Sequence, residues 1–206
     1  MKLKVASALV ATLVAVSPLA VFAQNDSLSS ADRAMLQEEL KASLDGFLSS
    51  VEGLSEAQWR YKPAANRWSI AEVAEHIAAT DELIGNMVTT SLPPIAPLPP
   101  DSAVRTDERV RLAMRDRSKR FDAPPVIQPA GKYATRTDLL QALTEIRNKL
   151  NRYLETTRDP LRNRGLPHPA LGPLDGVQWV VLLAGHEVRH TQQIEEVKQS
   201  EGYPRP

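Results

Sequence analysis

The sequence predicts an all-α protein, a four-helix bundle with long crossover connections. Four stretches repeat apolar residues at the spacing of three and four that gives a helix one buried face. Most of the sixteen prolines fall outside these stretches, in 91–100, 124–129 and 160–173. No stretch shows the alternation of a half-buried strand, and no internal repeat is present. Four helices with proline-marked connections favour a bundle.

The first and third helices are expected over residues 30–51 and 137–157. The apolar side of the first consists of Leu36, Leu40, Leu44, Phe47 and Val51. The apolar side of the third consists of Leu139, Leu143, Ile146, Leu150 and Tyr153. Both sets keep the helical period over about twenty residues, so both helices should pack against a core.

The second and fourth helices also have marked starts. Ser69 and Glu72 form a capping box that opens a helix lasting to about Thr89, and Asp175 is the N-cap of a helix over 176–199. The inward residues of the second are Ile70, Val73, Ile77, Ile84 and Val88. Those of the fourth are Trp179, Val180, Leu183 and Ala184.

Three connections join the helices. Residues 53–67 form a polar loop with a short turn near 55–59, and 158–173 form a Pro/Gly loop. The connection over 91–136 is long and contains a charged amphipathic piece over 106–121. Its seven basic side chains between 105 and 120 are mixed with acidic ones and lack interleaved aromatics. This pattern indicates a solvated helix face and not a nucleic-acid site.

Residues 1–23 are expected to be a secretory signal peptide, and 24–206 the bundle domain. Lys2 and Lys4 precede an apolar run of about a dozen residues, and Val21 and Ala23 offer small residues for cleavage. The run is shorter than the ~20 residues of a spanning helix, and an uncleaved anchor is the alternative. We therefore expect a periplasmic or secreted protein, with no membrane association after cleavage.

Composition excludes several functions. Removing residues 1–23 takes away two lysines and no acid, which leaves 23 basic and 25 acidic side chains and a net charge of −2. With this charge balance, the chain has no net positive charge that would attract nucleic acid or anionic lipid. The chain has no cysteine, which excludes disulfides, thiolate ligands and cysteine nucleophiles.

Three of the four histidines fall on expected helices. His186 and His190 are four apart, so both imidazoles lie on one helix face. That face also carries apolar residues such as Leu183, so it should point inward, where unpaired imidazoles would be costly. His76, on the flank of the second helix, would be the third ligand of a divalent metal ion. Taken alone, His76 is more typical of a core histidine bonded to a carbonyl or carboxylate than of a metal ligand.

Three histidines without sulfur suit zinc, nickel, iron or manganese, and leave coordination positions open. Gln193, three residues beyond His190, either orients a metal ligand or bound water through a hydrogen bond or is an ordinary surface glutamine. Glu187 is either a general base or a solvated side chain. Residues 186–190 also spell the H-E-x-x-H of zincin metalloproteases, but only sixteen residues follow and none is a histidine. His168, between two prolines, reads as an inert loop histidine.

Three stretches together resemble the DinB-like superfamily of metal-binding four-helix bundles. They are 54–76 with Trp59, Trp68 and His76, 107–131 with Arg117 and Phe121, and 171–193 with Gly172, Asp175, His186, His190 and Gln193. The resemblance implies that His76, His186 and His190 are the metal ligands, and that the ion is nickel, zinc, manganese or iron. It also implies small-molecule chemistry, because members include thiol S-transferases and a maleylpyruvate isomerase. An export signal would separate this chain from the cytosolic thiol pool.

These observations lead to two hypotheses of different classes. The first is an exported metal-dependent enzyme, a hydrolase or transferase, that acts on a small molecule. The second is a non-catalytic metal-binding protein. The zincin-type metalloprotease is a third and weaker alternative. The sequence is also compatible with a homodimer, because bundles of this kind often pair.

Overall fold

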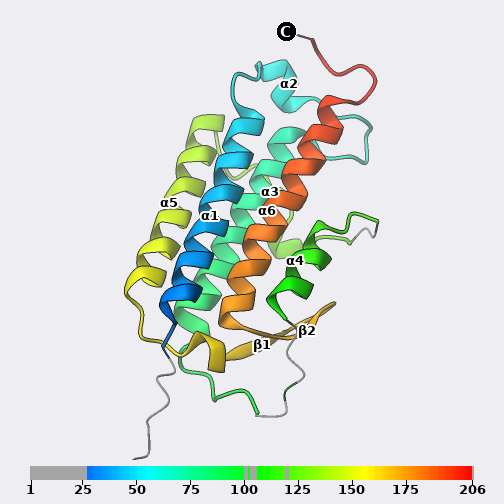
Figure 1. Ribbon diagram of the computed structural model, residues 1–206. Coiled ribbons are helices and arrows are strands. Elements are labelled where there is room, and N and C mark those ends of the chain that lie inside the picture. Colours follow the sequence, from blue (N-terminus) through cyan, green and yellow to red (C-terminus); the bar gives the residue numbers. More distant parts are fainter. Residues whose placement is uncertain (1–26, 100–101, 103–105, 119–120, 206) are drawn as a thin grey trace, which may run out of the picture.

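The computed structural model describes residues 27–99, 102, 106–118 and 121–205. Four long helices lie side by side: α1 (Ser30–Val51), α3 (Ile70–Asn86), α5 (Arg136–Thr156) and α6 (Gly176–Lys198) (Figure 1). The predicted four-helix bundle is confirmed. The predicted signal segment 1–23 lies outside the described residues, so its boundary stays a prediction. Among the described residues, no helix is both long and apolar enough to cross a bilayer.

The helix directions explain the long crossover. In Figure 1, α1 and α6 run upward while α3 and α5 run downward. Because α3 and α5 are parallel neighbours, the connection between them has to return along the bundle, and the helix over 107–115 packs against α6 on this path. Each of α3, α5 and α6 begins with a capping box in which the N-cap side chain and the third residue exchange hydrogen bonds.

Short elements complete the ends of the bundle. They are α2 (Glu56–Arg60), the π-helical turn η1 (Met87–Ser91), the satellite helix α4 (Asp107–Arg115), and the 3₁₀ turns η2 (Pro125–Ile127) and η3 (Leu161–Asn163). The predicted turn near 55–59 corresponds to α2. The helix expected over 106–121 ends earlier, because Asp116 takes an extended conformation and turns the chain away.

The expectation that the chain has no strands was wrong. Strands β1 (Gly165–His168) and β2 (Gly172–Asp175) form an antiparallel hairpin at the start of α6. Proline interrupts both strands, which removes the alternation by which a strand is recognised. The hairpin depends on glycine: a Cβ on Gly165 would lie 2.5 Å from the carbonyl oxygen of Leu174, and Gly172 has a φ of +77°.

A layer of polar residues divides the core. Two apolar clusters fill the two halves of the bundle, and between them each long helix contributes one buried polar side chain. These four residues, here called the polar layer, are Ser43, Asp81, Arg147 and Glu187. On α5 the buried stripe therefore includes Arg147 and Leu154, whereas the predicted Ile146 and Tyr153 are only half-buried.

Candidate metal centre

His76 is held in the second turn of α3 by contacts on two sides. Its side chain is 3% exposed, and the ring of Trp68 packs against it with centroids 4.9 Å apart. Its Nδ1 lies 2.7 Å from the carbonyl oxygen of Ile127. A carbonyl can only accept, so Nδ1 carries the proton and Nε2 keeps its lone pair in the neutral ring.

The long crossover supplies that carbonyl. The carboxylate of Glu75, on α3, accepts hydrogen bonds from the backbone N–H groups of Ala130, Gly131 and Lys132 at 2.8–3.1 Å. These contacts fix the segment after η2 against α3. No pattern of side chains predicts this contact, because a backbone carbonyl is available at every residue.

The three histidines on α3 and α6 converge on one point. His186 and His190 have ring centroids 4.3 Å apart, and His76 lies 4.9 Å and 4.6 Å from them. The Nε2 atoms of His76 and His186 are 3.1 Å apart, and one ligand atom from each histidine lies within 4.8 Å of the others. Two nitrogens bound to one ion at 2.0–2.1 Å would be about 3 Å apart. Three imidazoles in this arrangement could hold a divalent metal ion.

The outer nitrogens of His76 and His190 fit ligation through Nε2. The Nδ1 of His190 lies 2.8 Å from Oε1 of Gln193, which places Gln193 where the sequence predicted it. His76 has the equivalent acceptor in Ile127. The Nδ1 of His186 is buried and has no hydrogen-bond partner among the described residues. Metal-binding histidines usually donate this outer N–H, and that contact fixes the ring and raises its basicity.

Burial keeps the imidazoles neutral, as ligation requires. Burial lowers the pKa of His76. Burial and then the adjacent His190 and His76 hold the pKa of His186 well below its ordinary value. Burial, with a further contribution from His76, lowers the pKa of His190 to about 3. All three rings therefore offer a lone pair at neutral pH.

Two arginines attach the end of α4 to α6 beside this cluster. Arg117 donates to the carbonyl oxygen of Arg189 at 3.0 Å and forms a bidentate pair with Glu196 at 2.7 and 2.9 Å. Arg189 donates in return to the carbonyl oxygens of Met114 and Asp116. Arg117, one of the basic residues of the charged piece, thus makes structural contacts.

Glu187 does not face the histidines. Its carboxylate is buried in the polar layer, where it accepts a hydrogen bond of 2.5 Å from Arg147, so the expectation of a solvated side chain was wrong. Burial raises the pKa of Glu187, against the opposing charge of Arg147. A zincin needs this glutamate beside the metal, where it activates water. The geometry therefore supports neither a general-base role for Glu187 nor a metalloprotease.

Sequence reasoning missed Arg147 and Asp81, although a signal was present. Arg147 lies between Leu143 and Leu150 on the apolar stripe of α5, and Asp81 interrupts the corresponding stripe of α3. A charged residue at the centre of an apolar stripe predicts a buried ion pair.

His168 stands apart from the histidine cluster, since its Nδ1 accepts from the N–H groups of Ala170 and Leu171.

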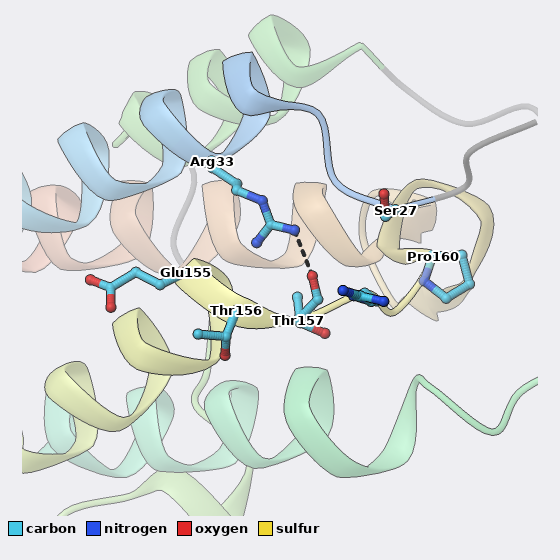
Figure 2. Close-up of a pocket in the computed structure, with 7 residues that line it drawn as sticks. Ser27, Arg33, Glu155, Thr156, Thr157 and Pro160 are labelled. Atoms are coloured by element: carbon cyan, nitrogen blue, oxygen red, sulfur yellow. Dashed lines mark hydrogen bonds between the residues drawn. The ribbon is translucent and has the colours of Figure 1, made fainter.

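A separate open pocket of about 590 Å³ lies where α1 begins and α5 ends (Figure 2). It is lined by Ser27, Arg33, Glu155, Thr156, Thr157, Arg158 and Pro160. Figure 2 shows the guanidinium of Arg33 turned toward Thr157, and it donates to the carbonyl oxygens of Leu154 and Thr157. None of the three histidines lines this pocket.

The fold and the histidine cluster together define a helical-bundle protein with a three-histidine site suited to a divalent metal. The chain belongs to the DinB superfamily, whose sequence model matches residues 39–194. It is 27% identical over 150 residues to the uncharacterised protein YuaE of Bacillus subtilis (strain 168). That alignment covers 72% of this chain and 88% of YuaE.

Two solved structures share the fold. One is YfiT from Bacillus subtilis, described as a probable metal-dependent hydrolase with an unusual four-helix bundle topology. Its TM-score is 0.54 at 16% identity, over 86% of this chain and 92% of YfiT. The other is TT2238, a four-helix bundle protein, with a TM-score of 0.50 at 17% identity, over 80% of this chain and 98% of TT2238. At these identities the likeness concerns the fold alone.

Proposed function

We propose that this protein is an exported metal-dependent enzyme, a hydrolase or transferase, that acts on a small molecule. His76, His186 and His190 would hold the divalent ion. The observation that carries the proposal is the convergence of three neutral imidazoles from two helices, with two Nε2 atoms 3.1 Å apart. Two ring nitrogens this close either share one proton or face a common ion.

The surroundings of the cluster fit a metal site. The carbonyl of Ile127 and the amide of Gln193 accept from the outer nitrogens of His76 and His190, which presents both Nε2 atoms to the centre. Three protein ligands leave coordination positions open, as in catalytic sites and unlike closed structural ones. A divalent ion bound there supplies Lewis acidity, the chemistry of a metal-dependent hydrolase.

The ion, the location and the partners are part of the proposal. An all-imidazole donor set accepts zinc, nickel, iron or manganese. The signal-like segment 1–23 would direct the chain to the periplasm or outside the cell, where its substrate would be met. A homodimer is compatible with the bundle. N-terminal sequencing of the exported protein tests the signal, since an intact Met1 would overturn cleavage.

Metal analysis of the purified protein tests the site. We expect about one equivalent of a divalent metal in the wild type, and loss of most of it in His190→Ala. His168→Ala is the matched control, because this histidine lies outside the cluster and should leave the metal content unchanged. Equal metal content in wild type and His190→Ala would overturn the proposed site.

A non-catalytic metal-binding protein is the second candidate. It is favoured by the position of the 590 Å³ pocket, which is not lined by any of the three histidines. Hydrolysis of a chromogenic ester such as 4-nitrophenyl acetate separates the candidates. Hydrolysis that is lost on chelation and in His190→Ala supports the enzyme. A metal-loaded protein that does not hydrolyse a panel of esters, amides and lactones supports the second candidate.

A further inference from the structure

The polar layer joins all four long helices through one side chain. Arg147, on α5, donates through Nε to Asp81 of α3 and through Nη2 to Glu187 of α6 at 2.5 Å. Its Nη1 donates to the carbonyl oxygen of Leu40 on α1 at 3.4 Å. The arginine side chain is 1% exposed and both carboxylates are 0% exposed.

Stability alone does not account for these buried charges. Removing three charges from water costs more than their attraction commonly returns, and well-packed apolar residues of similar volume are often as stable or more so. Here two acidic groups share one arginine, and Asp81 Oδ1 has no hydrogen-bond partner among the described residues. An ion pair with an unsatisfied carboxylate oxygen in a core of leucine and valine indicates a role other than stabilisation.

The two carboxylates belong to the helices that carry the histidines. Glu187 is adjacent to His186 and three residues before His190, and Asp81 is five residues after His76. Successive residues on a helix are turned by 100°, so the direction of Glu187 determines the directions of His186 and His190. Fixing Glu187 and Asp81 to one guanidinium fixes the rotation of α6 relative to α3.

We propose that Asp81, Arg147 and Glu187 are positioning residues that hold α3 and α6 in the rotation at which the three histidines converge. This inference rests on the proposed metal function. The geometry of the guanidinium suits the role, because its planar fork presents donors in fixed directions to two carboxylates at once.

A small rotation would be enough to dismantle the site. Side-chain ends lie ~5–6 Å from a helix axis, so a rotation of about 15° moves an imidazole by about 1.5 Å. Ligand distances in metal sites agree within about 0.2 Å. The apolar contacts of α6 do not set the rotation so narrowly, since side chains around its first half are buried on every side.

The test replaces all three charges together. In the variant Asp81→Leu/Arg147→Met/Glu187→Leu no charge is left unpaired, so it should fold with a urea midpoint at or above that of the wild type. We expect its Zn²⁺ affinity, measured by competition with a chromophoric chelator, to fall about 10–100-fold. The visible spectrum of the Co²⁺ form should shift, because it reports ligand geometry. A folded triple variant with wild-type Zn²⁺ affinity would overturn the inference.

A control separates positioning from general destabilisation. Arg162 also pairs with aspartates, namely Asp32, Asp107 and Asp175, but at the end of α6 away from the histidines. Arg162→Met should lower the urea midpoint and keep the Zn²⁺ affinity within about twofold of the wild type. If it weakens Zn²⁺ binding as much as the triple variant does, affinity follows stability and the inference fails.

Two further outcomes remain decisive. If the triple variant does not fold, Arg147→Lys keeps the positive charge but loses the fork, and we expect weaker Zn²⁺ binding and an altered Co²⁺ spectrum. Wild-type affinity in this variant would overturn the inference. If the wild-type protein binds neither Zn²⁺ nor Co²⁺, the proposed function fails and the inference falls with it.

Discussion

Replacing Asp175 by asparagine should stabilise the protein at neutral pH. Asp175 is 5% exposed at the N-cap of α6, where its carboxylate accepts from the N–H of Gln178 at 2.7 Å. Burial raises its pKa from 3.8 to about 6, although Arg162 at 3.3 Å opposes the shift. Asparagine is an equally good N-cap and carries no charge, so the variant isolates the cost of burying the carboxylate.

The pKa shift gives the size and the sign of the effect. A pKa that is raised in the folded state contributes stability at low pH, and this contribution is lost as pH rises through the folded pKa. A shift of about two units corresponds to ~3 kcal/mol between the protonated and ionised forms. The folded wild type therefore loses about 2 kcal/mol of stability between pH 4.5 and pH 7.5, as Asp175 ionises. Asp175→Asn should therefore gain up to ~3 kcal/mol over the wild type at pH 7.5, and about 1 kcal/mol at pH 4.5.

Urea denaturation of both proteins at the two pH values measures the effect. Groups other than residue 175 titrate in both proteins, so their contributions cancel in the difference between the two free energies of unfolding. A difference that does not change between pH 4.5 and pH 7.5 would refute the reasoning. A wild type that is the more stable protein at pH 7.5 would show that the ion pair with Arg162 outweighs the cost of burial.

Four other substitutions give separate tests. Gln193→Leu removes the acceptor for His190 and should weaken Zn²⁺ binding about 10–100-fold in chelator competition without lowering the thermal midpoint; unchanged affinity would contradict this. A Cβ on Gly185 would lie 2.8 Å from the Cβ of Met114, so Gly185→Ala should cost ~1–3 kcal/mol in urea denaturation. Gly46→Ala, where nothing lies within 4 Å, should instead gain ~0.5–1 kcal/mol. Glu75→Ala should speed hydrogen exchange at residues 130–132, and exchange at the wild-type rate would exclude its anchoring role.

Local patterns in the sequence were enough to predict the helices. The start of α3 was predicted from Ser69 and Glu72, and the structure shows the capping box with both hydrogen bonds. Helix periodicity and caps depend on residues within one or two turns, so they can be read without knowledge of the fold. The hairpin of β1 and β2 could not be read in this way, because its pairing requires the close approach at Gly165 and not a local alternation.

The charged residues were harder to place. Arg117 and Arg111 read as part of a solvated face, but each is paired with a glutamate on another helix. Sequence spacing states which residues share a face of one helix, and it does not state which element covers that face. The helical spacing of the charged piece likewise continues past Asp116, and it does not show that the chain turns away there.

The sequence by itself determined which helices form and which histidines share a face, because a separation of four residues on a helix has only one geometric meaning. Only the tertiary structure decided that His76 meets His186 and His190, and that Glu187 turns to Arg147 instead of to the metal site. Neighbouring residues on a helix differ by 100° in direction, and the packing of the other helices decides which direction faces the interior. A motif such as H-E-x-x-H therefore has no fixed chemistry until the fold assigns each side chain its surroundings.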